Sequence, residues 1–417
     1  MNNREDALNV WSERQLVGRL WRNLQGMIGF RYEPDWCQQG FAISHTLPLQ
    51  AAAFEPETGQ AHRFFANLLP EGGARTQLVR DLKISDTDFD LLRAIGGECA
   101  GALSLLPVEE TASVEFEYHR LTVEELDRLV LRRGIPMVDF RNERPRLSLA
   151  GAQNKCPVLV AEGAYWLPRN EAPSSHILKF ELPDYRNLPA FETFTSLLAA
   201  SVGLPTAEVA LRSVNGRYFC EIGRYDRVQN QSGVLQRLHQ EDFCQALGSG
   251  HERKYQEDGG PSFANCMQLV RQVSSDPAID MQHLLDWQIF NVLAGNSDGH
   301  AKNLSLLYLP GQQVRLAPFY DLVCTRAIER IDSRLAMDVG GERNPYIVTS
   351  AHWEAQAKTC GLGQRLVKSR VANMIEKLQQ HLQPTQAIFE EQFGDYPALQ
   401  RVVQVVRKTC NTASRFL

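Results

Sequence analysis

The spacing of apolar residues along the chain changes at about residue 147 and again after about residue 229. Within the first 110 residues, turn-rich segments precede RFFANLLPEGGARTQLVRDL and SDTDFDLLRAIGGECAGALSLL, whose apolar residues follow helical spacing. In the second segment, Ser85 or Asp86 suits a helix start and Gly96 suits a left-handed helix end. We therefore expect a small helical domain over residues 1–110.

Short β-type runs dominate the next part of the chain, residues 111–228. A connector comes first, with the helical stretch LTVEELDRLVLRRG, whose start has the pattern of a capping box. It is followed by LSLAGAQNK, CPVLVAEGAYWLP with a Glu162–Gly163 turn, and SHILKFEL. PAFETFTSLLAASVGLP predicts one inserted helix that Gly203 ends, and RYFCEIGRYDR reads as another strand. This pattern predicts a small β-rich lobe.

Helical spacing returns over residues 229–417, in LLDWQIFNVLAG and in RLVKSRVANMIEKLQQHL. The loop HERKYQEDGGPS, which begins at His251, is polar and Gly-rich, and we expect it to be exposed. The fold class is thus α+β, with a small β-rich lobe, a mainly helical lobe and an extra N-terminal domain.

Composition limits the function classes without choosing among them. A chain of 417 residues exceeds one compact core, and 43% hydrophobic with 22% charged residues is typical of a globular protein. A net charge of −5 argues against DNA or RNA as the direct main partner. Nine cysteines without a CxxC pair argue against disulfides and zinc knuckles, and no secretion signal or apolar run of membrane-spanning length occurs. We expect a cytoplasmic protein with no membrane contact.

The most informative motif is NSDGHAKN, residues 296–303, followed eighteen residues later by Asp321 in PFYD. Protein kinases place a catalytic Asp five positions before a metal-binding Asn in HRDxxxxN, and Asp298 and Asn303 repeat that spacing with Asn-Ser in place of His-Arg. We expect helix 284–294 to end at Gly295 and a hairpin, NLSLLYL to VRLAPFY across a Pro310–Gly311 turn, to return Asp321 beside Asn303.

This arrangement predicts that Asp298 is the base and that Asn303 and Asp321 bind Mg²⁺ against the ATP phosphates. The spacing alone is equally consistent with a structural turn, and the downstream hairpin is what favours the kinase interpretation. His300 either orients the acid or contacts phosphate, or it only holds the loop. Lys302 either neutralises charge on the transferred phosphoryl group or is a solvated lysine.

A second group of residues predicts the nucleotide site. Lys179, in the strand SHILKF, suits the α and β phosphates, and Glu192 thirteen positions later suits a partner for it. The alternatives are a lysine with its head in solvent and a solvated Glu192. A loop of small residues before this strand suits phosphate contacts through its backbone, although an ordinary β-turn explains it as well. Its candidate ATP-binding residues are Ala150, Gly151, Ala152, Gln153, Asn154 and Lys155.

Adenine recognition has the weakest signal. Gly223 and Tyr225 fall where a strand that connects two lobes offers backbone groups and a ring, and a core tyrosine in a strand is the competing interpretation. The histidines form no HExxH and the serines no GxSxG, so neither a zinc enzyme nor a serine hydrolase is supported.

The motifs LSLAGAQNK, SHILKF, FNVLAGNSDGHAKN and APFYDL, in this order, resemble the HipA family of bacterial toxin kinases, as do FFANLLPEGGAR and IGGECAGAL near the N-terminus. The resemblance covers nearly the whole chain and implies a two-lobed protein-kinase-like fold that uses ATP and Mg²⁺. It implies the toxin of a type II toxin–antitoxin pair with a helix-turn-helix (HipB-like) antitoxin, so that DNA is contacted only through the antitoxin. It also implies a protein substrate such as an aminoacyl-tRNA synthetase, with inhibited translation and growth arrest or persistence.

Carried over residue by residue, the resemblance places the catalytic Asp on Asp298, the metal ligands on Asn303 and Asp321, and the ATP lysine on Lys179. It also places a regulatory autophosphorylated serine on Ser148, where composition alone suggests only a strand serine. Phosphate at Ser148 adds about two negative charges where ATP phosphates bind, which would switch the enzyme off.

Two other functions stay open at this point. A small-molecule or lipid kinase uses the same acid, amide and acid, and it would place phosphate on a metabolite. A non-catalytic corepressor would act with its antitoxin on operator DNA, transfer no phosphate, and keep repression in an Asp298→Ala variant.

Overall fold

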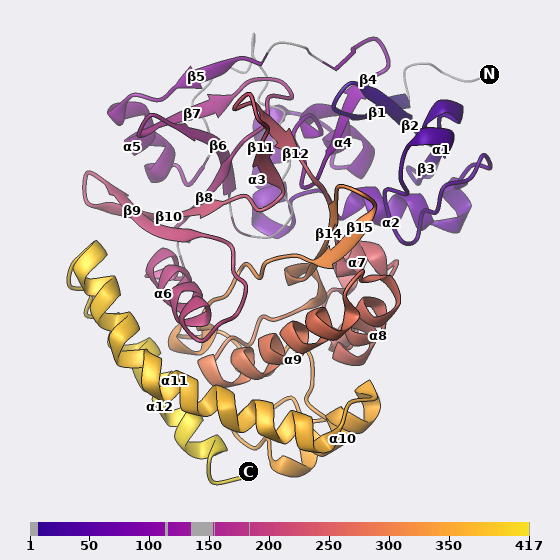
Figure 1. Ribbon diagram of the computed structural model, residues 1–417. Helices are drawn as coiled ribbons and strands as arrows, with labels where there is room; N and C mark the ends of the chain where they lie inside the picture. Colours follow the sequence, from indigo (N-terminus) through magenta and orange to yellow (C-terminus); the bar gives the residue numbers. More distant parts are fainter. Residues whose placement is uncertain (1–6, 113–115, 135–152, 154, 183, 417) are drawn as a thin grey trace. The chain divides into compact units, whose positions relative to one another are not determined.

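The computed structural model describes residues 7–112, 116–134, 153, 155–182 and 184–416 (Figure 1). The contacts between residues divide the chain into two compact units. Unit 1 contains Met1–Phe180, Gly223–His251 and Leu306–Gln312, and unit 2 contains Glu181–Ile222, Glu252–Ser305 and Gln313–Leu417. The division into domains at residues 110 and 228 remains a prediction.

Unit 1 begins with an antiparallel sheet rather than with the small helical domain that the sequence pattern predicts. Its strand order is β3-β2-β1-β4. The strands are β1 (Ala7–Ser12), β2 (Gln15–Arg22), β3 (Ile28–Tyr32) and β4 (Leu103–Pro107). The β1–β2 connection lacks the Asn-Gly or Asp-Gly pair typical of a hairpin, and Glu13 itself takes the left-handed φ of 50°. The sheet was missed because its turn has no local sequence signature.

Short helices cover the apolar side chains of this sheet. They are α1 (Pro34–Gln39), α2 (Gln60–Ala66), α3 (Gly72–Leu82) and α4 (Asp88–Ile95). Phe30, Phe65 and Phe89 are fully buried in one hydrophobic cluster with strand residues. The core of this region is therefore the space between sheet and helices.

Two predicted details of α4 were wrong. Thr87, rather than Ser85 or Asp86, is the N-cap, because its side chain accepts from the N–H of Asp90. Gly96 has a φ of −70° and is not left-handed. It is required for another reason, since a Cβ there would lie 2.4 Å from the carbonyl oxygen of Leu92.

A second antiparallel sheet in unit 1 contains β5 (Tyr118–Arg120), β7 (Ala164–Pro168), β6 (Lys155–Ala161) and β8 (His176–Phe180). The predicted turn between β6 and β7 is confirmed, and Glu162 and Gly163 have φ values of 53° and 70°. Helix α5 (Val123–Leu131) starts with the predicted capping box of Thr122 and Glu125. Short strands β11 (Arg227–Gln229), β12 (Leu235–Arg237) and β13 (His239–Asp242) and helix α7 (Phe243–Ala246) follow later in the chain.

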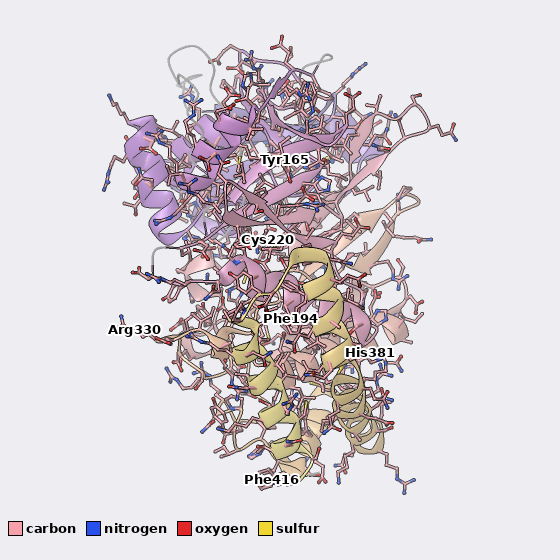
Figure 2. The ribbon with its side chains drawn as sticks, turned by 90° about the vertical axis from the view of Figure 1, so that its left-hand side faces the viewer. Tyr165, Phe194, Cys220, Arg330, His381 and Phe416 are labelled. Carbon is pink, nitrogen blue, oxygen red and sulfur yellow. The ribbon has the colours of Figure 1, made fainter. Side chains whose placement is uncertain are left out.

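Unit 2 is mainly helical. Its helices are α6 (Leu188–Ser201), α8 (Phe263–Val273), α9 (Pro277–Ala294), α10 (Ser350–Cys360), α11 (Gln364–Phe393) and α12 (Leu399–Ala413). The buried helix α9 packs against α8, α11 and α12. The rings of Phe194 in α6 and Phe389 in α11 have their centres 5.9 Å apart. Figure 2 shows Phe194 next to the yellow C-terminal helices. The strands β9 (Val209–Val214) and β10 (Arg217–Gly223) pair antiparallel.

A hairpin follows the end of α9. Strand β14 (Ser305–Leu309) and strand β15 (Gln313–Leu316) are joined by a turn in which Gly311 and Gln312 have φ values of 78° and 60°. The N–H of Ala317 donates to the carbonyl of Ser305 at 2.9 Å, so the chain returns to the start of β14 as predicted. Within the described residues, no helix is both long enough and apolar enough to cross a lipid bilayer.

Candidate active site

The candidate catalytic loop, residues 296–303, starts where α9 ends. Gly295 caps the helix with a left-handed φ of 80°, and its N–H donates to the carbonyl of Asn291. A Cβ on Gly295 would lie 2.6 Å from Cγ1 of Val405. Conformation and available space both require glycine here, which confirms the predicted end of the helix.

Asn296 and Ser297 hold the start of this loop, at the place where the HRDxxxxN motif of protein kinases has His-Arg. The Asn296 amide donates to Oδ1 of Asn291 at 3.0 Å, and its own Oδ1 accepts from the N–H of Asp298 at 3.1 Å. The N–H of Ser297 donates to Oγ1 of Thr325 at 2.8 Å. Because both residues are buried, these bonds fix the backbone that presents Asp298.

Asp298 keeps a side chain that is 50% exposed within this otherwise buried loop. The hydroxyl of Tyr255 donates to its Oδ1 at 2.8 Å. Nε2 of His300 lies 3.9 Å from the same oxygen, and the His300 ring packs edge-on against Tyr255. His300 thus lies beside the acid, and its role stays a prediction. Lys302 is only 7% exposed, so the interpretation as a solvated lysine was wrong.

Asn303 and the segment before Asp321 meet at the other end of the loop. Nδ2 of Asn303 donates to the carbonyl of Asp298 at 2.9 Å. The hydroxyl of Tyr320 donates to the carbonyl of Lys302 at 2.8 Å, which places the neighbour of Asp321 against the neighbour of Asn303. Asp321 itself has a left-handed φ of 59°.

The donor atoms of this pair fit Mg²⁺. Because the Asn303 nitrogen is engaged by the Asp298 carbonyl, its Oδ1 is the atom that remains for a metal. An amide oxygen and a carboxylate are the hard oxygen ligands that Mg²⁺ takes in phosphoryl-transfer sites. Asn303 and Asp321 would therefore hold the ion.

The lysine that is predicted to contact the ATP phosphates lies in unit 1. Lys179 is at the inner end of β8, 4% exposed, and is directly opposite Lys155 of β6 in the antiparallel register. Gln153 donates its side-chain amide to the carbonyl of Phe180 at 2.8 Å. In unit 2, Glu192 of α6 is 1% exposed. The interpretations of Lys179 and Glu192 as solvated side chains were wrong, and their pairing remains a prediction.

Other predicted residues of the phosphate loop lie outside the described residues. They are Ser148, Ala150, Gly151, Ala152 and Asn154.

Gly223 and Tyr225 differ from the expected continuous strand. Strand β10 ends at Gly223, and Tyr225 lies in the turn that follows, before β11. Its hydroxyl donates to Oε1 of Gln240, and the side chain is only partly buried. The competing interpretation as a core tyrosine in a strand was therefore wrong.

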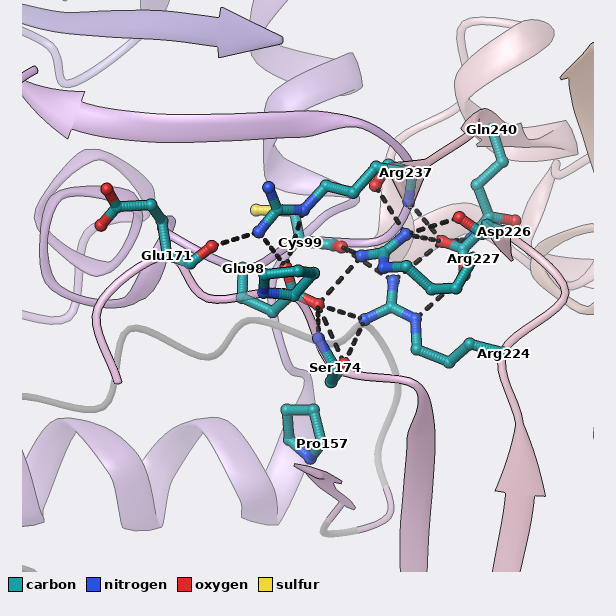
Figure 3. Close-up of polar contacts among 12 residues, drawn as sticks. Glu98, Cys99, Pro157, Glu171, Ser174, Arg224, Asp226, Arg227, Arg237 and Gln240 are labelled. Carbon is teal, nitrogen blue, oxygen red and sulfur yellow. Dashed lines mark hydrogen bonds and ion pairs between the residues drawn. The ribbon is translucent and has the colours of Figure 1, made fainter. Parts of the chain in front are cut away.

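Around this turn lies a buried ionic cluster that sequence reasoning missed (Figure 3). The carboxylate of Glu98, in the IGGECAGAL segment, is fully buried and accepts from Arg224 at 2.8 Å, Arg227 at 2.9 Å and Arg237 at 2.7 Å. Asp226 pairs with Arg224 at 2.8 Å and accepts from the N–H of Gly101 at 2.7 Å.

The cluster ties the N-terminal region of unit 1 to the segment on both sides of Tyr225. Burial alone would raise the pKa of Glu98, but the guanidinium groups of Arg227, Arg237 and Arg224 lower that pKa well below its usual range. The only sequence signals were an acid inside an otherwise apolar, Gly-rich segment and the alternation of charges in GRYDR.

The fold and the loop at residues 296–303 define the class of this chain as an α+β protein of the kinase type. Two family models then narrow the class, since a HipA-like C-terminal domain matches residues 147–382 and a HipA N-terminal domain matches residues 8–106. The chain belongs to the HipA family.

Individual relatives agree with this assignment. The chain is 38% identical to "Putative kinase Y4mE" of Sinorhizobium fredii, over 89% of each chain. It is 30% identical to "Serine/threonine-protein kinase toxin HipA" of Shewanella oneidensis, over 84% of this chain and 82% of the relative. A solved structure of Shewanella oneidensis HipA with HipB and operator DNA superposes with a TM-score of 0.85 at 26% identity, covering 98% of this chain and 97% of the other. The chain is therefore an enzyme of the serine/threonine protein kinase class.

Proposed function

We propose that this chain is an ATP- and Mg²⁺-dependent serine/threonine protein kinase that acts as the toxin of a type II toxin–antitoxin pair. Asp298 is the catalytic base, Asn303 and Asp321 are the metal ligands, and Lys179 neutralises the α and β phosphates. Lys302 neutralises charge on the transferred group, and His300 orients the acid. The observation that carries the proposal is the bond from Asn303 to the Asp298 carbonyl, which joins base and metal ligand in one rigid loop.

The half-exposed carboxylate of Asp298 suits proton transfer from an incoming hydroxyl. The hydroxyl oxygen of the protein substrate forms a bond to the γ-phosphorus of ATP, the bond from that phosphorus to the β,γ-bridging oxygen breaks, and the hydroxyl proton moves to Asp298. ADP leaves with the bridging oxygen. Bound Mg²⁺ would supply positive charge to the phosphates.

The proposal also assigns roles in ATP binding to residues of unit 1. Gln153, and Lys155 at the start of β6, are proposed to contact the phosphates together with the predicted loop residues Ala150, Gly151, Ala152 and Asn154. The turn from Gly223 to Tyr225 is proposed to contact adenine. The support from geometry is the burial of Lys179 and the anchoring of Gln153 on the carbonyl of Phe180.

The proposed partner is a helix-turn-helix antitoxin of the HipB type, and DNA is contacted only through it. This rests on the Shewanella relative, whose solved structure contains HipA, HipB and operator DNA. The proposed substrate is a component of translation such as an aminoacyl-tRNA synthetase, following the family resemblance. Autophosphorylation of Ser148 is the proposed off-switch, because a phosphate there repels the phosphates of ATP.

Phosphosite mapping by mass spectrometry tests this proposal. The purified chain is incubated with Mg-ATP, with the Asp298→Ala variant in parallel. We expect phosphate on Ser148 in the wild type and none in the variant. Absence of phosphate from both, together with no binding of Mg-ATP by calorimetry, would contradict the kinase proposal and favour the corepressor function.

A further inference from the structure

Tyr255 contacts the candidate base, Asp298, although no sequence motif connects the two residues. It belongs to the loop HERKYQEDGGPS, for which the sequence predicts nothing but exposure. In unit 2 its hydroxyl donates to Oδ1 of Asp298 at 2.8 Å across 43 residues of sequence. We propose that Tyr255 is a positioning residue, which holds the Asp298 carboxylate so that its other oxygen, Oδ2, faces the acceptor hydroxyl.

The contacts of Asp298 are divided between its two oxygens in the way this role requires. Within the part of the chain that the structure describes, the side-chain contacts of Asp298 fall on Oδ1, from Tyr255 at 2.8 Å and from His300 at 3.9 Å. The side chain is nevertheless 50% exposed. A carboxylate anchored through one oxygen presents the second in a defined direction, which is what a general base needs.

The loop that carries Tyr255 is itself built against the catalytic loop. The N–H of Gln256 donates to the carbonyl of Ala336 at 3.3 Å, and the N–H of Ala336 donates to the carbonyl of Ser297 at 3.0 Å. Ser297 directly precedes Asp298. The backbone beside Tyr255 is thus connected through Ala336 to the backbone beside the acid that its hydroxyl binds.

Local structure also restricts the tyrosine. Its carbonyl accepts from Asp258 at 3.1 Å and from Gly260 at 3.0 Å, which closes a tight turn. A Cβ on Gly260 would lie 2.1 Å from the carbonyl oxygen of Arg253, so this close turn requires glycine. The ring packs edge-on against His300 with centres 5.1 Å apart. The phenol therefore reaches Asp298 from a fixed position.

Tyr255→Phe tests the role, because it removes only the hydroxyl. Tyr396→Phe is the matched control, since the hydroxyl of Tyr396 also donates one bond, to Oδ1 of Asn187 at 2.9 Å elsewhere in unit 2. The rate of phosphate incorporation is measured in the full chain at saturating Mg-ATP, with the Kd of Mg-ATP by calorimetry. We expect Tyr255→Phe to lower the rate by about tenfold or more with Kd changed less than about twofold, and Tyr396→Phe to change neither.

An equal and measurable rate of phosphate incorporation in wild type and Tyr255→Phe would overturn the proposal. So would a matching loss of Mg-ATP binding and melting temperature, which would indicate a merely structural role. Phosphate mapped to Tyr255 in the wild type would also overturn it, because the phenol would then be an acceptor.

The inference rests on the proposed kinase function, and a second measurement separates the two. Hydrogen exchange of the amides in residues 299–303 is followed by mass spectrometry without nucleotide. Faster exchange in Tyr255→Phe and unchanged exchange in Tyr396→Phe support the positioning contact even if the wild type transfers no phosphate, a result that would contradict only the kinase function. Unchanged exchange in Tyr255→Phe counts against the contact itself.

Discussion

Asn303 donates its side-chain amide to the backbone carbonyl of Asp298 at 2.9 Å, so one short bond holds the proposed metal ligand close to the proposed base, five residues earlier in the chain. The same bond occupies the amide nitrogen and leaves the amide oxygen for the proposed metal. Asp298 and Asn303, five residues apart in the sequence, are therefore also held close together in the structure.

Asn303→Ala removes the oxygen ligand and this bond together. We expect kcat for phosphate transfer to fall by about 100-fold or more, because the loop loses its alignment as well as a metal contact. Steady-state kinetics at several Mg²⁺ concentrations measure this. Full activity of Asn303→Ala at high Mg²⁺ would show that the residue is not part of the reaction centre.

Thr325→Val tests how the start of the catalytic loop is held. The Thr325 hydroxyl is buried, accepts from the N–H of Ser297 at 2.8 Å and donates to the carbonyl of Gly295 at 3.3 Å. Valine leaves that N–H without its acceptor, so the free energy of unfolding should fall by about 1–3 kcal/mol in urea titrations.

Thr359→Val is the control for this substitution. Thr359 is exposed on α10, where its hydroxyl donates to the carbonyl of Ala355 at 3.0 Å. We expect a change within about 0.5 kcal/mol. Equal effects of the two substitutions would contradict the role assigned to Thr325.

Glu98→Gln tests the buried ionic cluster. It removes one negative charge from among Arg224, Arg227 and Arg237 at nearly constant volume, and we expect a loss of about 3–5 kcal/mol in unfolding free energy at pH 7. The lowered pKa of Glu98 fixes the sign of the pH dependence. Its stabilisation is present above the unfolded pKa and is lost only as the pH falls through the lower folded pKa.

The control for Glu98 is Glu57→Gln, whose exposed carboxylate accepts one bond from Asn23 at 3.2 Å. It should leave the urea midpoint unchanged. A Glu98→Gln variant with the wild-type midpoint at pH 7 would mean that the cluster does not stabilise unit 1.

Glu241 should give unit 1 a pH dependence of the opposite sign. It is fully buried in unit 1 and accepts from Ser44 at 2.6 Å, from the N–H of His45 at 2.9 Å and from Tyr308 at 2.5 Å. Burial raises its pKa from 4.5 to about 7, although these hydrogen bonds act to lower it. The folded state therefore holds an extra proton between these values, and the unfolding free energy contributed by Glu241 falls as the pH rises through them.

Glu241→Gln should remove this dependence. The difference in unfolding free energy between variant and wild type should grow in favour of the variant by up to about 3 kcal/mol from pH 5 to pH 8. Glutamine is tolerated because the Ser44 hydroxyl can accept from its amide while donating to Thr46, 2.9 Å away. Burial lowers the pKa of the nearby His239 to about 4, an opposite effect that is common to both proteins and cancels in the difference. Parallel curves for the two proteins would refute the titration of Glu241.

Features with a local physical cause could be predicted from the sequence. The end of α9 at Gly295, the capping box at Thr122 and the turn at Glu162–Gly163 each depend on neighbours within a few residues, and all three are confirmed. The first sheet of unit 1 was missed because the β1–β2 turn uses Glu13 in place of a glycine signature. Gly96 was misassigned because its reason is close packing, which is invisible in one segment.

The sequence by itself determined the proposed chemistry: an acid, an amide five residues on and a second acid after a hairpin, in a chain that belongs to the HipA family. Only the tertiary structure decided which side chains surround that chemistry. Tyr255 meets Asp298 across 43 residues, and Glu98 meets Arg227 across 129. The packing of distant segments decides which residues become partners. A buried charge or hydrogen-bond donor needs a partner, and only the fold brings one within about 3 Å.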